Sequence, residues 1–133
     1  MLAQPERTPG RRPLLILAYA DSTYASLAGR YFRRLGWEVH LTSSGTEARR
    51  LARTLAPTVV VLDTDLADES GWLTCDKLRR ERPNQKVVLV SPNPNEEGRR
   101  LAEFVGAATL VCRGVGVSSL IEEVLGKALQ AVG

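Results

Sequence analysis

Short apolar runs alternate along the chain with longer segments in which apolar residues recur every third or fourth position. The run at residues 59–62 is Val-Val-Val-Leu, with polar residues beyond it. A continuous apolar run of this length is typical of a strand buried in a parallel sheet, and the longer spacing is typical of an amphipathic helix. We predict strands at residues 14–18, 38–41, 58–63, 86–91 and 109–112, each followed by a helix.

Capping residues mark the ends of the predicted helices. The second helix is predicted to begin at Ser44, with Glu47 as its reciprocal capping partner, and the fourth to begin directly after Asn93. A capping box formed by Ser119 and Glu122 is predicted to open the last helix. The first helix is predicted to end at Gly36 and to place on one apolar face Tyr24, Leu27, Ala28, Tyr31 and Leu35.

Strands that alternate with helices favour an α/β domain, because parallel strands need right-handed crossover connections. The economical arrangement is a doubly wound (βα)5 fold of the flavodoxin-like kind. It has a five-stranded parallel sheet in the order 2-1-3-4-5 with helices on both faces. A length of 133 residues suits one such domain. We assign residues 14–133 to this domain and residues 1–13, which lack an apolar period, to a disordered tail.

Charge and hydropathy exclude several classes of function. The formal net charge is +3, and most of the excess comes from the arginines of the tail, so the domain carries no charge signature of nucleic-acid binding. No apolar stretch approaches the ~20 residues of a membrane helix, and no signal-peptide core is present, so we expect a cytoplasmic protein without a membrane partner. Cys75 and Cys112 lack metal-ligand spacing and are interpreted as reduced core thiols.

The candidate site is at the C-terminal end of the third predicted strand. Asp63 ends that strand, Asp21 follows the first strand, and Ser91 and Arg113 end or follow the fourth and fifth strands. In open α/β sheets, sites lie at the C-terminal edge of the strands, so these side chains are expected to converge there. A Ser/His/Asp set, a P-loop and a glycine-rich dinucleotide fingerprint are all missing from the sequence, so we predict that the chain is not an enzyme.

The spacing of several residues resembles the receiver domain of response regulators, the chemotaxis-regulator-like module of two-component signalling. The resemblance covers residues 14–131. It rests on Gly36, Ser-Gly-Thr-Glu-Ala at 44–48, Asp63 with Gly71, Leu-Arg-Arg at 78–80, Ser91 and Gly-Ala at 106–107. It implies that Asp63 is the phosphoacceptor, that Ser91 and Arg113 contact the phosphoryl group, and that Asp65 lends its backbone carbonyl to a Mg²⁺ site.

The chain departs from this pattern where the metal and the phosphoryl group would bind. The acidic pair that the family places after the first strand falls on Tyr19 and Ala20, neither of which offers a charged oxygen to a hard cation. Pro92, which follows Ser91, has no N–H to donate. We therefore predict a degenerate pseudo-receiver with no cofactor and doubtful Mg²⁺ binding. The candidate ligands of a weak or lost metal site are Asp21, Asp63 and Asp65.

The charged residues of this region also have a purely structural interpretation. Asp63 and Arg113 are predicted to form an ion pair that holds the surrounding loops together. Asp65, Asp68 and Glu69 are interpreted as a solvated acidic loop.

The sequence leaves three functions open. The first is a signalling module that binds a histidine kinase, an attached output domain or another protein through the face of the fourth helix, fifth strand and fifth helix, with homodimerisation left open. The second is a working phosphoacceptor that uses Asp63 with Asp21, Asp65 and Arg113. The third is a flavin or nucleotide binder whose phosphate would lie at a helix N-terminus, in the loop at residues 21–26.

Overall fold

The computed structural model describes residues 12–130 and places them in a parallel five-stranded sheet flanked by α-helices. The strand order is β2-β1-β3-β4-β5, as predicted. The strands are β1 (Leu14–Ala18), β2 (Glu38–Thr42), β3 (Val59–Asp63), β4 (Lys86–Ser91) and β5 (Thr109–Cys112). The helices are α1 (Ser22–Arg34), α2 (Gly45–Leu55), α3 (Gly71–Glu81), α4 (Glu96–Phe104) and α5 (Val117–Gln130), with a 3₁₀ turn, η1 (Arg113–Val115), before α5.

The predicted tail, residues 1–13, lies almost wholly outside the described residues. Its last residue, Pro13, is buried, and the Pro13 carbonyl accepts a hydrogen bond from the Glu38 amide at 2.9 Å. Pro13 therefore belongs structurally to the start of the sheet.

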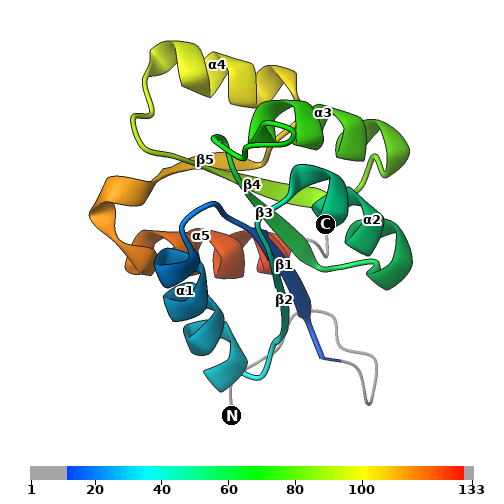
Figure 1. Cartoon of the computed structure of the whole chain (residues 1–133), viewed down its shortest axis with the longest axis vertical. Coiled ribbons are helices and arrows are strands. Elements are labelled where there is room, and N and C mark those ends of the chain that lie inside the picture. Colours follow the sequence, from blue (N-terminus) through cyan, green and yellow to red (C-terminus); the bar gives the residue numbers. More distant parts are fainter. Residues whose placement is uncertain (1–11, 131–133) are drawn as a thin grey trace.

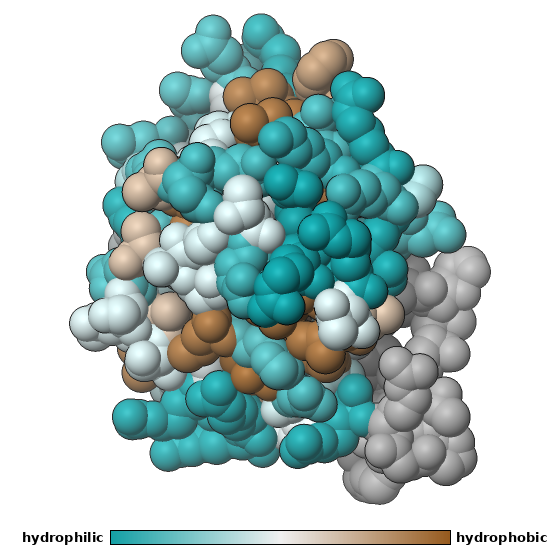
Figure 2. Space-filling view, turned by 45° about the vertical axis from the view of Figure 1, so that its right-hand side comes forward, coloured by the Kyte–Doolittle hydropathy of each residue, from teal (hydrophilic) through white to brown (hydrophobic). Residues whose placement is uncertain are grey.

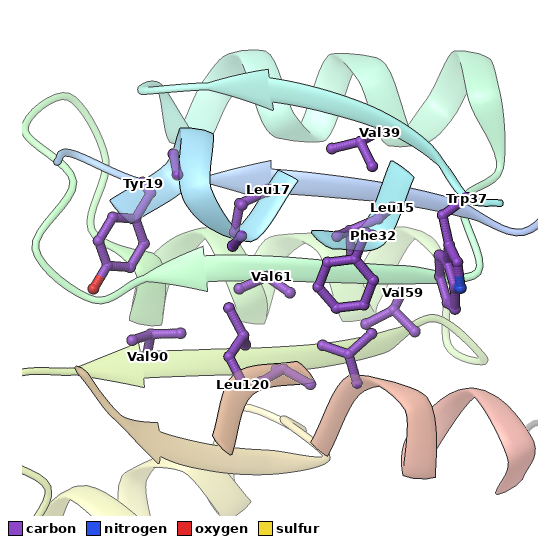
Figure 3. Packing of buried hydrophobic residues seen from close by; sticks show 14 of the residues in the cluster. Leu15, Leu17, Tyr19, Phe32, Trp37, Val39, Val59, Val61, Val90 and Leu120 are labelled. Atoms are coloured by element: carbon purple, nitrogen blue, oxygen red, sulfur yellow. The ribbon is translucent and has the colours of Figure 1, made fainter. Parts of the chain in front are cut away.

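Helices cover both faces of the sheet (Figure 1), and the side chains between helices and sheet form two apolar cores. One core lies between the sheet, α1 and α5, where Leu17, Phe32 and Leu120 meet; Figure 3 shows its packing. The other lies between the sheet, α2, α3 and α4, and contains Ile16 and Leu78. Successive strand residues point to opposite faces, so strands covered on both sides must be apolar throughout. This requirement explains the continuous run in β3, every residue of which is buried.

Four of the sequence predictions about helices are wrong in detail. Leu27 and Tyr31 of α1, and Leu35 just after it, remain 40–44% exposed, because the face that packs on the sheet is a narrow one rich in small residues. The buried face of α1 consists of Ala25, Ala28, Gly29 and Phe32. On α2, the Glu47 side chain pairs with Arg50 and does not complete a reciprocal cap at Ser44.

The other two errors concern helix starts. Asn95, not Asn93, caps α4, because the Asn95 side chain accepts a hydrogen bond from the Gly98 amide at 2.7 Å. Helix α5 begins at Val117, so Ser119 lies inside it and cannot open it. Gly116 adopts a φ of +85° immediately before this helix, a conformation that favours glycine and lets the chain turn from η1 into α5.

The remaining expectations from composition concern membranes and thiols. No helix within residues 12–130 has the length and apolar character to cross a bilayer. Both cysteines are free thiols: Cys75 is fully buried and Cys112 is half-buried. Burial raises the pKa of the Cys75 thiol to about 12, so this cysteine stays protonated at neutral pH.

Candidate functional site

The C-terminal edge of the sheet collects the residues that the sequence singled out. Asp63 ends β3, Ser91 ends β4, and Arg113 follows β5 directly. The strand register pairs Asp63 with Val90 and Ser91 with Cys112, so these side chains stand on neighbouring strands. Asp21 follows β1 at the same edge.

Asp63 is fully buried, and backbone amides satisfy both of its carboxylate oxygens. Oδ2 accepts a hydrogen bond from the Ala20 amide at 3.0 Å, and Oδ1 accepts one from the Asp65 amide at 2.9 Å. The side chain therefore ties the β1–α1 loop to the β3–α3 loop. Gly71 packs directly against this point, since a Cβ atom at Gly71 would lie 2.3 Å from the Asp63 carbonyl oxygen.

Tyr19 stands beside Asp63 at the end of β1. The register pairs Ala18 with Leu62, so Tyr19 and Asp63 occupy the next positions of adjacent strands. Figure 3 shows the Tyr19 ring at the end of the sheet toward which the strands run. The side chain is only 1% exposed and stacks on Tyr24, with ring centroids 4.4 Å apart and an interplanar angle of 17°. An aromatic residue of the core thus occupies the place that the receiver pattern gives to an acidic residue.

The Tyr19 hydroxyl is buried and has no hydrogen-bond partner in the described part of the chain. Burial, with smaller contributions from Tyr24 and Asp63, raises the pKa of this phenol well above its usual range; the nearby Arg113 opposes the rise. The hydroxyl is therefore neutral throughout the physiological pH range.

Arg113 lies over Tyr19, with its guanidinium carbon 6.0 Å from the ring centroid. This distance is at the limit of a cation–π contact. The Tyr24 hydroxyl donates a hydrogen bond to the Gly116 carbonyl at 3.5 Å, next to η1. The predicted ion pair between Arg113 and Asp63 does not form within residues 12–130: backbone amides bind the Asp63 oxygens, and Arg113 lies over Tyr19.

Ser91 is 8% exposed, and its hydroxyl accepts a hydrogen bond from the Asn93 amide at 3.3 Å. Pro92, between them, has no N–H of its own. The serine hydroxyl therefore stabilises its own loop, and its predicted role as a phosphoryl contact stays a prediction.

The other two candidate metal ligands serve the backbone or face solvent. The Asp21 carboxylate caps α1 by accepting hydrogen bonds from the amides of Thr23 and Tyr24 at 2.9 and 3.3 Å. Asp65 is exposed and donates its amide to Asp63. Across residues 12–130, no three His, Cys, Asp or Glu side chains come together as a metal site.

Asp68 is a structural residue that the sequence interpretation missed. Its carboxylate accepts hydrogen bonds from the amides of Gly45 and Thr46, at the start of α2, at 3.0 and 3.2 Å, and another from the Ser44 hydroxyl. These contacts, led by the Gly45 amide, hold the pKa of Asp68 well below its usual range. The spacing of Asp68 and α2 along the chain gives no signal of this contact; only the fold brings them together.

Glu69, which the sequence pattern assigns to a solvated loop, is only 7% exposed. Its carboxylate accepts hydrogen bonds from Arg49, Lys77 and the Thr74 hydroxyl, so it joins the β3–α3 loop to α2 and α3. The face over α2 and the neighbouring part of α3 is largely hydrophilic (Figure 2), as expected for helices joined by such charge pairs. Two successive acidic residues, Asp68 and Glu69, therefore hold the loop after Asp63 against α2 and α3.

The family model for the response regulator receiver domain matches residues 17–125. The chain is 29% identical over 111 residues to the probable transcriptional regulatory protein TcrX of Mycobacterium tuberculosis, covering 83% of this chain and 47% of that protein. It is 23% identical over 90 residues to the photosynthetic apparatus regulatory protein RegA of Rhodovulum sulfidophilum, covering 68% and 49%. The chain thus spans about half the length of these relatives.

Solved structures show the same fold. The CheY-like response regulator receiver domain protein of Methanospirillum hungatei JF-1 superposes with a TM-score of 0.84 at 17% identity, covering 91% of this chain and 97% of that chain. The receiver domain of the Francisella response regulator 1452 superposes with a TM-score of 0.82 at 20% identity, covering 92% and 100%.

Proposed function

The chain belongs to the response regulator receiver family, and we propose that it is a signalling module that acts mainly through protein–protein contacts, with impaired or absent Mg²⁺-dependent phosphorylation at Asp63. The observation that carries this proposal is Tyr19. A buried aromatic ring, stacked on Tyr24 and lying under Arg113, occupies the position where the receiver pattern places a metal-binding carboxylate.

The residues at the sheet edge do not fit a bound Mg²⁺ ion. Mg²⁺ prefers a compact octahedral set of oxygen ligands with one or two carboxylates. Here Oδ1 of Asp21 caps α1, and each Asp63 oxygen already accepts a hydrogen bond from a backbone amide, that of Ala20 or Asp65. Phosphoryl transfer depends on cations that offset the charge of the phosphoryl oxygens, so a site without the metal is expected to react slowly.

The groups around the phosphoryl position support the same conclusion. Arg113 lies over the Tyr19 ring, and its planar fork is a poor substitute for a lysine ammonium. Ser91 is engaged with Asn93, and Pro92 supplies no amide. Arg113 would have to move from its position over Tyr19 to contact a phosphoryl group on Asp63, whereas the Ser91 hydroxyl, which accepts from Asn93, could still donate its proton.

The surface of α4 supports a function through contacts. Phe104 is 82% exposed and Leu101, three residues before it on the same helix face, is 39% exposed. An exposed aromatic beside a leucine is typical of an interface anchor. We assign the partner to the face of α4, β5 and α5. The partner is a histidine kinase, an attached output domain or another signalling protein, in keeping with relatives described as transcriptional regulators and about twice as long.

Phosphorylation can be tested with acetyl phosphate and Mg²⁺, with the intact mass as the readout. We expect no adduct in the wild type and a phosphoryl adduct in Ala20→Asp, which adds a carboxylate at an exposed position beside Asp63. Ala20→Asn is the matched control, since it has a similar shape without the charge. A wild-type adduct that disappears in Asp63→Asn would establish the second candidate function, a working phosphoacceptor, for which the placement of Asp63 and Ser91 on adjacent strand ends is the supporting observation.

Partner binding is tested with a partner captured by pull-down. We expect Phe104→Ser to weaken binding about tenfold or more, equal to ~1.4 kcal/mol, while unfolding free energy changes by less than about 0.5 kcal/mol. Asp63→Asn should leave affinity unchanged. The NH₂ group of the new asparagine would face one of the two backbone N–H groups that now donate to Asp63, which can destabilise the fold. Thermal unfolding of this variant must therefore be measured together with its binding. Loss of binding in a folded Asp63→Asn protein would contradict the proposal.

A further inference from the structure

Helix α1 carries an unbalanced positive charge beside β2, an edge strand of the sheet. The helix contains three arginines and no acidic residue. Arg30, Arg33 and Arg34, together with Ser26 and Leu41 of β2, line a hollow of about 440 Å³ between α1 and β2. Figure 1 shows α1 beside β2, the strand at one edge of the sheet.

These arginines differ from those of α2 in their partners. On α2, Arg50 pairs with Glu47 and Arg53 pairs with Glu81. Within residues 12–130, no carboxylate forms an ion pair with Arg30, Arg33 or Arg34. Arg33 is held in place, since its Nη2 donates to the Val39 carbonyl at 3.1 Å. The hollow therefore presents exposed cations, one of which is anchored to the neighbouring strand.

The hollow also has an apolar element. Leu41 is 37% exposed and lies against α1 where Gly29 has no side chain: a Cβ atom at Gly29 would be 3.4 Å from Leu41 Cδ2. The aliphatic stems of the surrounding arginines add further apolar surface below their charged heads. A ligand with both apolar and anionic groups would match this surface better than a purely anionic one.

We propose that the hollow between α1 and β2 docks an acidic segment of a partner protein, with an apolar side chain against Leu41 and carboxylates on the arginines. Charge complementarity selects this occupant, and Arg–carboxylate pairs can be bidentate. The chain's own N-terminal residues do not suit it, because they hold three arginines against one glutamate. A nucleic acid would use the cations and leave Leu41 unmatched. The surface is separate from α4, which covers the opposite face of the sheet.

The proposal can be tested by NMR titration of the ¹⁵N-labelled protein with a short synthetic peptide of glutamate and leucine. We expect the shifted amides to cluster in residues 26–41 and the double variant Arg30→Gln/Arg34→Gln to weaken binding about tenfold or more. Arg50→Gln/Arg53→Gln is the matched control. It removes the same charge from arginines that already have carboxylate partners, and it should stay within about twofold of wild type.

Several outcomes would overturn the proposal. Absence of localised shifts at millimolar peptide, or equal weakening in the two double variants, would mean that the hollow has no specific role. If a peptide of glutamate alone bound as tightly as the glutamate–leucine peptide, the proposed contact of an apolar side chain with Leu41 would be wrong. Tighter binding of oligothymidylate at the same amides would assign the hollow to nucleic acid instead.

Discussion

Replacing Tyr19 by phenylalanine removes one hydroxyl from the core beside Asp63 and leaves the ring in place. The side chain is 1% exposed, and its hydroxyl has no hydrogen-bond partner in the described residues. A buried polar group without a partner costs about 1–3 kcal/mol relative to one that is satisfied. We therefore expect Tyr19→Phe to stabilise the protein by about 1 kcal/mol, the lower end of that range, because Arg113 lies close enough to interact weakly with the hydroxyl.

Urea denaturation followed by Trp37, which is buried in the same core as Tyr19, measures this difference. The midpoint should rise without a change in slope, since the exposed surface in the two states is nearly the same. In a thermal scan, the same 1 kcal/mol corresponds to an increase of about 4 °C in Tm for a domain of this size. Tyr24→Phe is the matched control: its hydroxyl donates to Gly116, so that variant should not gain stability.

The pH dependence provides a second readout of the same reasoning. The folded-state pKa of Tyr19 is raised above its ordinary value of 10.0, so the unfolded chain loses this proton first as pH rises. The stability linked to the neutral phenol is fully present below pH 10.0 and declines above it. Tyr19→Phe should lose less stability than wild type in that range. Destabilisation of Tyr19→Phe at neutral pH would refute the argument, because it would show that the hydroxyl makes a favourable bond.

Two further predictions concern the loop after Asp63. Gly71→Ala should destabilise the protein by about 3 kcal/mol, because the new Cβ would lie 2.3 Å from the Asp63 carbonyl oxygen. Gly126→Ala is the control: Gly126 lies in α5 with open space around it, so this variant should be about 1 kcal/mol more stable. Urea denaturation midpoints measure both changes. Asp68→Ala should cost about 1 kcal/mol at neutral pH, discounted for solvent exposure. The pKa of Asp68 is lower in the folded protein than its ordinary value of 3.8, so the stability difference between wild type and Asp68→Ala should narrow as pH falls below 3.8. Stability curves of the two proteins that stay parallel in acid would contradict this prediction.

The periodicity of the sequence was sufficient to predict the sheet. Buried parallel strands must be apolar on both faces, so the runs at β1, β3 and β4 were visible without any knowledge of their neighbours. Right-handed crossovers favoured a parallel sheet with helices on both faces, and the order 2-1-3-4-5 chosen for it is the one observed. Helix ends were predicted less well. Capping depends on which of several nearby Asn or Ser residues has an extended backbone, as Asn95 does and the sequence pattern alone does not reveal.

The sequence also predicted that Asp63, Ser91 and Arg113 would share one edge, because each stands at or just after the end of a parallel strand. It could not predict their partners. Two backbone amides hold Asp63, the Tyr19 ring lies under Arg113, and Asp68 caps a helix that begins 23 residues earlier. Strand ends follow from local hydrophobic patterns, whereas these contacts join segments distant in sequence. Only the packed tertiary structure brings such groups within hydrogen-bond distance and thereby decides which side chains remain free for chemistry.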